Sequence, residues 1–584
     1  MRRPDDYDGV HPLSEEIPVP IEGRLPAVVD PDAADRLTMA TERTVLVVVH
    51  TITAWNRFQD VLPVFDSDRR IQLVFTFPDA AVISPDLKQY LAAAGAVVVP
   101  WEQALRTRFD LALSAHHSGP LQRIQAPLAV LSHGMGYTKY STGSREPGAG
   151  SREPGAGSRD TYGLSAPWLV RDGELIAKAI VLSHTEQLDR LRSAVPEAAT
   201  AAIVAGDPCF DRLLASTHNR VRYREALGID DDRTLVTISS TWGPRSLFGS
   251  RPDLVASLTA ELDLDSYTLA LVLHPNIWYA HGAAQIKLWL GDCLRSGLRL
   301  IPPDRGWQQT ILASDVLIGD NGAVSGYAAA VGVPTVLGAF EYQDVVPTSA
   351  IDALGRTARR IDRRRPFPEQ LAVHVTDARQ QSPVRTLVSS EPGMASARLR
   401  IAFYRMMALE PPTSPAPTPP YSPADLSPIG TAATTWWASV TGSTENSYHV
   451  RRWPSEPEAR RDQEPNRVRR HLLAATDEPR PDLSGLAAIQ VADEVLTSAQ
   501  LREVFDRHPA CSMIAVPGPV CRVVRRDGAE LLLRTDTGDP LPAVSVLYAE
   551  LSRGMSWLDL PTTFDVRLGH RMLHAEIVRH SSAR

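Results

Sequence analysis

The residues best suited to chemistry lie in the stretch 311–337, ILASDVLIGDNGAVSGYAAAVGVPTVL. Its apolar run 316–318 suits a buried parallel strand, the next residues suit a turn, and 323–331 favours a helix that stops before Pro334. A helix that begins at the carboxyl end of a strand presents free N–H groups and the positive end of its dipole. The stretch therefore predicts a site for an anionic group such as a diphosphate, formed by Asp320, Asn321, Gly322, Ala323 and Ser325.

Two histidines also follow apolar runs. His133 comes after PLAVLS, and His274 comes directly after LALVL. Ligands of open α/β sheets bind at the carboxyl ends of the strands, so both side chains are candidates for a site. A turn residue that caps a strand end is the alternative for His133, and a buried structural histidine is the alternative for His274.

Further polar or aromatic residues occupy similar positions. Thr241 and Trp242 end the run TLVTISS, where they suit contact with a nucleotide base or ribose; a core position is the alternative for Trp242. His50 and the pair His116 and His117 also follow strands. For His50 a structural role is favoured, and a metal site at the pair would need further ligands that the sequence does not place.

The elements that position these residues alternate between strands and helices. From Thr44 onward, TVLVVVH, RIQLVFTF, GAVVVPW, FDLALSA and PLAVLSHG are short runs rich in β-branched residues, separated by helix-capable segments, and IAKAIVLSH follows as a sixth. TLVTISS, YTLALVLH, LRLIPP, DVLIGD and PTVLGAF supply a second set. Such alternation predicts α/β architecture with two tandem Rossmann-like, doubly wound domains of the glycosyltransferase-B type.

Composition shifts divide the chain into segments. We expect a disordered lead-in over 1–42, a first Rossmann-like acceptor domain over 43–215 and a second, nucleotide-donor domain over 216–410. A Pro-, Arg- and Glu-rich linker over 411–480 and a small α+β C-terminal region over 481–584, of unreadable role, complete the prediction. Within the first domain, 143–160 duplicates the heptad GSREPGA and is expected to form a flexible surface insert.

Composition also excludes several classes of function. The net charge of −7, with basic residues spread along the chain, gives no reason to expect nucleic acid as a partner. The four lysines, Lys88, Lys139, Lys178 and Lys287, occur in no GxxxxGK[ST] pattern, which excludes a P-loop NTPase. The four cysteines are scattered and predict reduced thiols, not a metal site. No apolar run suits a signal peptide or a membrane span, so we expect a cytoplasmic protein.

Five segments in the region 44–340 carry a resemblance to the CDP-glycerol glycerophosphotransferase family, which builds poly(glycerol phosphate) chains of teichoic-acid type. LSHGMGYTK resembles the family's Trp-His-Gly segment, AGDPCFDRL its Gly-x-Pro-Arg-x-Asp turn, and ISSTWG its Ala-Pro-Thr-Trp/Phe strand end. LVLHPN matches its His-Pro strand end, and SDVLIGDNGAVSGYAAAVGVPTVL matches its Ser-Asp-Val-Leu-Ile-Thr-Asp-Tyr-Ser-Ser segment. Their common order makes the set more specific than any one of them.

The resemblance implies roles for the histidines. It makes His133 the general base that takes the proton of the acceptor hydroxyl, and His274 the residue that neutralises the donor diphosphate. It also implies a CDP-activated donor, a hydroxyl acceptor of polymer or lipid-linked type, no cofactor and no metal. Such an acceptor would bring the protein to the inner membrane face, where the Arg-rich stretch 359–365 could contact headgroups; a solvated charged loop is the alternative.

This sequence departs from the family pattern at two places. Gly322 and Ala323 replace the family's paired serines, which leaves backbone N–H groups and Ser325 as donors to phosphate. Cys209 stands where the family has arginine, and Asp207 adds a negative charge beside it. Two other functions therefore stay open: a sugar-nucleotide glycosyltransferase or epimerase of the same fold, and a non-catalytic nucleotide-binding scaffold.

Overall fold

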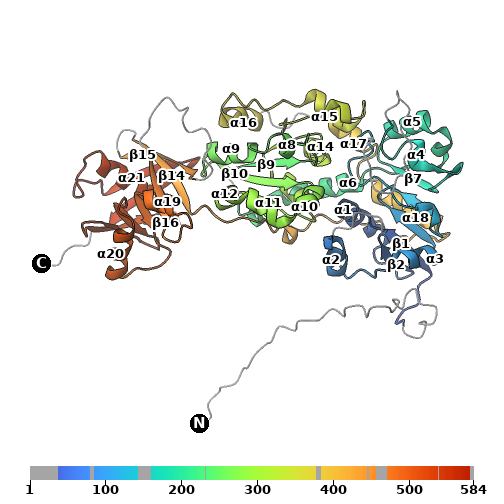
Figure 1. Cartoon of the computed structure of the whole chain (residues 1–584), viewed down its shortest axis with the longest axis horizontal. Coiled ribbons are helices and arrows are strands. Elements are labelled where there is room, and N and C mark those ends of the chain that lie inside the picture. The colour runs from blue at the N-terminus through green and yellow to red at the C-terminus, as the bar shows by residue number, and fades with distance from the viewer. Residues whose placement is uncertain are drawn as a thin grey trace, which may run out of the picture.

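The computed structural model describes residues 37–78, 85–141, 160–230, 232–376, 383–442, 446–455, 470–536 and 538–578. Most of the expected lead-in and of the heptad insert lies outside the described residues. The described chain forms three bodies in a row, with the second α/β body in the middle and a β-barrel at one end (Figure 1).

The first body contains a parallel sheet of six strands in the order β2-β1-β3-β4-β7-β8. The apolar runs become these strands because a parallel sheet is buried on both faces. Alternate residues of β1 enter two different cores, Val45 and Val47 on one face and Leu46 and Val48 on the other. The predicted strand GAVVVPW forms only a bridge between Val98 and Phe75. The strands are β1 Arg43–Val48, β2 Ile71–Thr76, β3 Leu111–Ser114, β4 Leu128–Val130, β7 Ala179–Leu182 and β8 Ala202–Val204, with a small hairpin of β5 Val170–Arg171 and β6 Glu174–Leu175.

Helices cover both faces of this sheet (Figure 1). They are α1 Ile52–Val61, α2 Pro85–Ala93, α3 Trp101–Arg106, α4 Ala166–Leu169, α5 Thr185–Ala194 and α6 Pro208–Ser216. Helix α18, Ala395–Met406, also packs here, because its residues Leu399, Phe403 and Tyr404 join the core of Val45 and Val47. The segment 216–410, expected to belong wholly to the second domain, therefore returns to the first.

The second body contains a parallel sheet of five strands in the order β11-β10-β9-β12-β13. Two tandem parallel α/β sheets are thus confirmed. The strands are β9 Thr234–Ser240, β10 Tyr267–Leu273, β11 Arg299–Ile301, β12 Val316–Gly319 and β13 Thr335–Leu337. The helices are α7 Arg220–Ala226, α8 Leu247–Ser250, α9 Leu254–Glu261, α10 Pro275–His281, α11 Ala283–Trp289, α12 Gly291–Arg295, α13 Trp307–Ala313, α14 Ala323–Ala330, α15 Ala350–Thr357, α16 Phe367–Thr376 and α17 Pro383–Val388.

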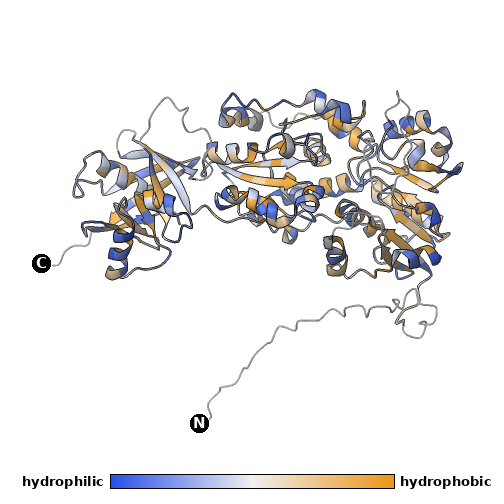
Figure 2. Cartoon of the chain, viewed as in Figure 1, coloured by the Kyte–Doolittle hydropathy of each residue, from blue (hydrophilic) through white to orange (hydrophobic). Residues whose placement is uncertain are grey.

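Hydropathy follows this layering. Figure 2 shows apolar residues concentrated on the strands of both sheets, whereas the surrounding helices alternate between apolar and polar residues. In α15 the buried residues include Ile351 and Leu354, while Arg356 is exposed. This helix therefore buries one apolar stripe, as an amphipathic surface helix does, whereas α14 is buried almost all round. In the described part of the chain, we find no helix with the length and apolar character that crossing a membrane requires.

The third body is a closed barrel of nine strands, in the order β14-β15-β21-β22-β20-β19-β18-β17-β16. The expected helix 498–507 and the strands of CRVVRRDGAELLLRT are present as α20, β19 and β20. However, the barrel begins at Thr435, so the expected linker supplies three of its strands. The elements are β14 Thr435–Gly442, β15 Ser447–Pro454, β16 Arg470–Ala475, α19 Pro481–Leu486, β17 Ile489–Val491, α20 Ser498–Arg507, β18 Met513–Val516, β19 Cys521–Arg525, β20 Glu530–Thr535, α21 Leu541–Ser552, β21 Thr563–Leu568 and β22 Arg571–Val578.

The barrel attaches to the second body at the amino-terminal ends of its strands. Arg452 of β15 is buried and binds Asp265, which lies two residues before β10, through N–O distances of 3.0 and 2.6 Å. Arg571 of β22 binds Asp232, two residues before β9. The barrel therefore lies at the end of this sheet opposite the carboxyl ends of its strands.

The Pro-rich segment after residue 410 is not a free linker, contrary to expectation. Tyr421 is buried and donates a hydrogen bond of 2.8 Å from its hydroxyl to Asp60 of α1. Tyr223 of α7 donates to the carbonyl of Tyr421 at 2.7 Å, and the guanidinium of Arg212 lies 4.0 Å from the centre of the Tyr421 ring. The side chain and the backbone carbonyl of Tyr421 together thus fix the segment against elements of both α/β bodies.

Replacement of Tyr421 by alanine should destabilise the protein by about 3 kcal/mol or more, because it removes a buried aromatic ring and its hydrogen bonds. Chemical denaturation followed by tryptophan fluorescence measures the change. The exposed Thr413 of the same segment provides the control, since Thr413→Ala should shift the curve by less than about 0.5 kcal/mol. Equal stability of the two variants would mean that the segment is not anchored by its tyrosine.

Candidate functional site

The candidate site lies where the topologies of the two sheets change direction. In the second sheet, β9 and β12 are neighbours, and the chain runs from β9 to β10 on one side but from β12 to β13 on the other, so the connections that leave their carboxyl ends diverge. In the first sheet the corresponding neighbours are β1 and β3. Loops diverge at such switch points and leave room for a ligand. Thr241 and Asp320 follow β9 and β12, whereas His50 and His116 follow β1 and β3.

The two bodies touch at these strand ends. Lys139, in the loop that follows β4, donates a hydrogen bond of 3.3 Å from Nζ to Oγ1 of Thr241. A β-carbon placed on Gly134 would lie 3.7 Å from Cβ of Ala323 at the start of α14. The loop that carries His133 is therefore in contact with the residues predicted to bind phosphate.

His133 carries its free lone pair on Nε2. Its Nδ1 lies 3.1 Å from the carbonyl oxygen of Ala115, which can only accept a hydrogen bond, so Nδ1 carries the proton of the neutral ring. Burial, with the nearby charges of Arg57 and Lys139, lowers the pKa of His133 to about 4. At neutral pH this side chain is an uncharged proton acceptor, as a general base must be.

His274 has the opposite tautomer. It caps α10, and its Nδ1 accepts a hydrogen bond of 3.1 Å from the backbone N–H of Asn276. The proton of the neutral ring therefore lies on Nε2, which becomes a donor. Burial is the main reason that its pKa falls to about 3, and the charges of Lys139 and His133 lower it further. His274 thus presents an N–H group beside a lysine.

Lys139 is a site residue that the sequence interpretation missed. Its ammonium group bonds to Thr241, and burial lowers its pKa, while the carboxylates of Asp320 and Asp344 act in the opposite direction. It brings a positive charge to the contact between the two bodies. The sequence holds one signal for it, the lysine that ends LSHGMGYTK, but only the fold places it beside β9.

The turn after β12 has a structural centre. The carboxylate of Asp320 is buried and accepts 2.9 Å hydrogen bonds from the backbone N–H groups of Thr241, Leu247 and Gly322. Burial raises the pKa of this carboxyl group. Asp320 therefore joins the loops after β9 and β12 and shapes the site, instead of facing a ligand. Asn321 is buried beside it.

The helix that follows supplies backbone donors only. Gly322 caps α14 without a side-chain hydrogen bond, and the amides of the first turn have no partner within a helix. A β-carbon on Gly322 would lie 3.0 Å from Oδ1 of Asp320, which leaves little space for a serine. The hydroxyl of Ser325 is fully buried and accepts a hydrogen bond from the N–H of Asp320, so it does not serve as the expected replacement donor.

Trp242 is an exposed aromatic residue at this site. About 55% of its surface is accessible, and its ring centre lies 6.4 Å from that of His274. The core position considered for Trp242 is therefore excluded, whereas Thr241 is buried and holds Lys139. A large, accessible ring beside a donor histidine provides a surface on which a nucleotide base could stack.

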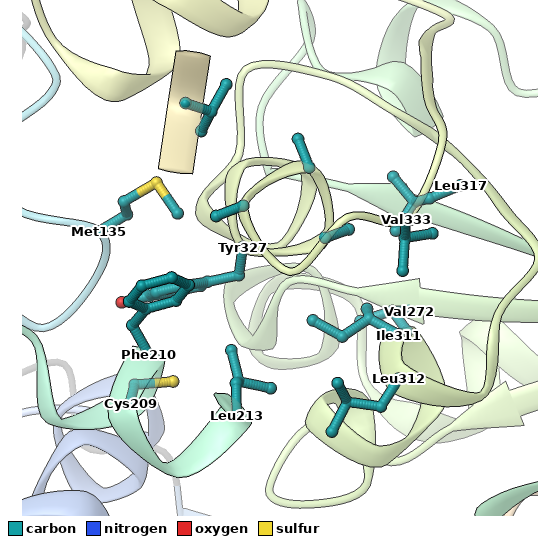
Figure 3. Packing of buried hydrophobic residues seen from close by; sticks show 14 of the residues in the cluster. Met135, Cys209, Phe210, Leu213, Val272, Ile311, Leu312, Leu317, Tyr327 and Val333 are labelled. Atoms are coloured by element: carbon teal, nitrogen blue, oxygen red, sulfur yellow. The ribbon is translucent and has the colours of Figure 1, made fainter. Parts of the chain in front are cut away.

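An apolar core joins the bodies behind the site (Figure 3). Met135, Cys209 and Phe210 of the first body pack with Tyr327 of α14 and with Ile311 of α13. Cys209 is 2% exposed, and burial strongly raises the pKa of its thiol. Cys209 is thus an interior contact. All four cysteines are free and buried.

A buried ion pair lies next to this core. Arg57 of α1 binds Asp207 at 3.0 Å, Tyr327 of α14 at 3.0 Å and the carbonyl oxygen of Gly134 at 2.6 Å. Tyr327 also donates a hydrogen bond of 2.8 Å to Asp207. The negative charge that the sequence placed beside Cys209 is therefore neutralised within the protein, and it does not repel a ligand.

The histidines that follow β1 and β3 in the first body pack around or near His133. The ring of His116 stacks between His50, at 5.0 Å, and His133, at 5.3 Å. Its Nδ1 accepts from the N–H of Ser118 at 3.1 Å, and its Nε2 lies 2.9 Å from the hydroxyl of Tyr162. His116 is thus fixed on both sides and supports the ring of His133. His117 packs separately against Tyr137, Tyr162 and Trp168.

Comparison with known proteins gives structural similarity without sequence support. No family model and no curated protein matches the chain. Among solved structures, the wall teichoic acid polymerase TagF is 13% identical, with 65% of this chain and 92% of that chain covered and a TM-score of 0.40. UDP-GlcNAc 2-epimerase from Methanocaldococcus jannaschii is 12% identical (62% and 99% covered, TM-score 0.38). A putative epimerase of the same kind from Listeria monocytogenes is 14% identical (63% and 96%, TM-score 0.38). Similarity at this level carries no argument about activity.

The stability of the protein should fall in mild acid because of its buried histidines. Burial lowers the pKa of His50 and His133 to about 4 and that of His117 and His274 to about 3. Between these values and about 6.5, the unfolded chain binds protons that the folded protein does not, so stability is lost as pH falls through this range. Differential scanning calorimetry should show a Tm that is nearly constant above pH 7 and declines from pH 6.5 to 4.

His50→Asn should reduce this pH dependence, since it removes one of the groups that titrates only on unfolding. His218→Asn is the matched control, because His218 is exposed. A decline of equal steepness in the wild type and in His50→Asn would show that His50 does not contribute to it.

Proposed function

We propose that the protein transfers a glycerophosphoryl group, or a related phospho-polyol unit, from a CDP-linked donor to a hydroxyl acceptor. The observation that carries the proposal is the pair of opposite histidine tautomers at the contact between the two sheets. His133 presents a lone pair from the first body, and His274 presents an N–H group from the second. Transfer to a hydroxyl requires both a proton acceptor and a donor to the leaving group.

In the proposed reaction, the acceptor hydroxyl attacks the phosphorus atom that carries the polyol. Nε2 of His133 takes the hydroxyl proton as the new P–O bond forms. The P–O bond to CMP breaks, and CMP leaves with the electron pair on its phosphate oxygen. The N–H group of His274, the ammonium of Lys139 and the first amides of α14 stabilise this charge.

The low pKa of His133 suits an ordered reaction. A neutral imidazole with a pKa of about 4 is a weak base before the donor binds. The negative charge of a bound diphosphate would raise this pKa, because a nearby anion favours the protonated ring. His133 therefore becomes a stronger base when the donor is bound. Without the donor, its low pKa keeps the ring unprotonated at neutral pH. Trp242 is the proposed stacking surface for the nucleotide base.

A sugar-nucleotide transferase or epimerase is the second candidate. The site has no serine hydroxyls at Gly322 and Ala323 to bind a phosphate, so nothing in this turn selects CDP-glycerol over another nucleotide diphosphate. A non-catalytic nucleotide-binding scaffold is the third. Donor selectivity and turnover separate the three functions.

We expect His133→Asn to lower the rate of CMP release by about 10² to 10⁴ with little change in donor affinity, because it removes the base. An asparagine N–H can still bond to the carbonyl of Ala115. His274→Asn keeps an oxygen to cap α10 but loses the Nε2 donor, so it should weaken donor binding at least about tenfold. Isothermal titration calorimetry and a coupled CMP assay measure the two effects.

His184→Asn is the matched control for both variants. His184 follows β7, and its Nδ1 caps α5 by accepting from the N–H of Glu186, as His274 does for α10. It lies outside the proposed site, so this variant should bind and turn over the donor normally. Normal turnover by His133→Asn would refute the proposed mechanism.

Selective stabilisation by ligands tests the class of donor. In a thermal-shift titration, CDP-glycerol and CDP should raise the Tm more than UDP-sugars or GDP-sugars, because a ligand that binds only the native state stabilises it. A preference for UDP-sugars or GDP-sugars would favour the sugar-nucleotide function. Tight binding without CMP release would favour the scaffold, and no response to any of these ligands would contradict nucleotide-dependent transfer altogether.

A further inference from the structure

The outer face of the barrel carries an ordered group of basic and hydroxyl side chains. In β14, β15 and β21, alternate residues such as Val440, Val450 and Val566 belong to the barrel core, so the residues between them point outward. The strand register places Arg470, Ser439 and Arg451 side by side across β16, β14 and β15, with Ser439 buried between the two arginines. In the next outward row, Thr441, His449 and Arg567 lie across β14, β15 and β21. We refer to these six residues as the basic face.

An aromatic ring fixes two of the arginines. The guanidinium of Arg451 lies 4.7 Å from the centre of the Trp453 ring, and that of Arg470 lies 4.6 Å from it. Trp453 itself is only 6% exposed. Guanidinium groups held on an aromatic ring lose less conformational freedom when they bind a phosphate than flexible side chains do.

The imidazole of the basic face lies among charges of both signs. Burial is the main reason that the pKa of His449 is lowered, the charges of Arg451 and Arg567 lower it further, and the carboxylate of Asp263 acts in the opposite direction. Two of the described carboxylates border the face, and one of them, Asp263, is paired with a cation of the face itself. Asp263 lies 3.8 Å from Arg451 and also accepts a hydrogen bond from the backbone of Ser266, and Asp565 lies 2.8 Å from the imidazole of His574.

The chemistry of the face suits phosphates separated by neutral spacers. Neighbouring outward residues lie about 5 Å apart across the strands, so the three arginines are spread over two adjacent rows and are not gathered in a single pocket. Proteins that bind single-stranded nucleic acid combine such cations with exposed aromatic rings on which bases stack. Here Trp453 is covered by the two arginines, and the six residues include no aromatic platform. The face can therefore contact a phosphodiester backbone but lacks a surface for bases.

Its location separates the basic face from the reacting atoms. Arg451 adjoins Asp263, four residues before β10, whereas His274 follows the other end of that strand. Seven strand residues span about 23 Å. A ligand of the basic face must therefore be long if it is also to reach the site.

We propose that the basic face of the barrel binds the phosphodiester backbone of an anionic polyol-phosphate chain, remote from its reacting end. The identity of the chain rests on the proposed function, in which such a polymer is the acceptor. Binding at the barrel would keep the chain attached between successive transfers, because a tethered end returns to the site at a high effective concentration.

The test is binding of a fluorescein-labelled glycerol phosphate oligomer of about ten repeats to the full-length protein without any donor, measured by fluorescence anisotropy. The double variant Arg451→Gln/Arg567→Gln should bind at least tenfold more weakly, because each charge-assisted contact contributes substantially. The control Arg525→Gln/Arg534→Gln removes the same charge from β19 and β20 of the same barrel and should bind normally.

Several outcomes would overturn the proposal. Equal losses of oligomer affinity in both double variants would mean that binding depends on the net charge of the barrel and not on the basic face. Equal binding of a single-stranded RNA with the same number of phosphates would identify nucleic acid as the ligand class. Arg567→Gln alone gives a second measurement, in case loss of the contact between Arg451 and Asp263 loosens the barrel; unchanged affinity in this variant would also contradict the proposal.

An activity measurement separates this inference from the proposed function. His133→Asn should bind the oligomer as the wild type does. With a long acceptor, Arg451→Gln/Arg567→Gln should raise the acceptor KM at least tenfold, whereas KM for a single glycerol phosphate unit should not change. Arginine-dependent oligomer binding without transfer from any donor would refute the proposed function and leave the binding surface intact. Transfer with equal KM values in all variants would support the proposed function and refute the binding surface on the barrel.

Discussion

The arrangement of the candidate site depends on one buried ion pair and its hydroxyl partner. Arg57, Asp207 and Tyr327 come from three different helices or their caps, and Tyr327 belongs to the second body. Asp207 also caps α6 by accepting from the N–H of Phe210 at 3.1 Å. Removing one member would leave a charge or a polar atom buried without its partner, which costs far more than an exposed pair contributes. The network therefore favours the one relative orientation of the two sheets in which all three side chains are paired.

That docking determines the chemistry of the loop after β4. Arg57 holds the carbonyl oxygen of Gly134, and Gly134 in turn lies against Ala323 at the start of α14. His133 precedes this glycine, so its ring orientation is tied to the same network. The apolar core of Figure 3 supports the contact from behind, since Met135 follows the glycine directly. The candidate site, made from two sheets, is thus flanked by a buried polar network and an apolar core that hold the two bodies together.

The histidines of the candidate site are buried without a carboxylate partner among the described residues, and this determines their charge. The histidines stay neutral because desolvation disfavours their charged forms, and the tautomer of each ring then follows from its backbone partner. His133 bonds to a carbonyl and becomes an acceptor, whereas His274 bonds to an amide and becomes a donor. Two identical side chains thereby obtain opposite roles. The positive charge comes instead from Lys139, in the same loop as His133.

The barrel adds a third body, and its contact with the second body also includes ion pairs. Its buried Arg452 is held between Asp265 of the second body and Asp539 before α21. Because this contact lies at the amino-terminal ends of the strands, the barrel cannot supply side chains to the candidate site. Any role in transfer must act at a distance, through an extended ligand.

The sequence by itself determined most strands of both sheets and the polar residues at their ends, although GAVVVPW formed only a bridge and β8 was not predicted. Buried parallel strands are continuous apolar runs, and the residue that follows each one is a local feature, so His133, His274, Thr241 and the turn 320–323 could all be found. The tertiary structure decided which of these ends meet. Arg57 and Tyr327 are 270 residues apart in the chain, and Lys139 and Thr241 are 102 apart. It also closed the barrel, because β15 pairs with β21 across more than 100 residues that were partly assigned to a linker. Such pairings depend on packing and charge burial between distant segments, for which local propensity and hydrophobic periodicity contain no signal.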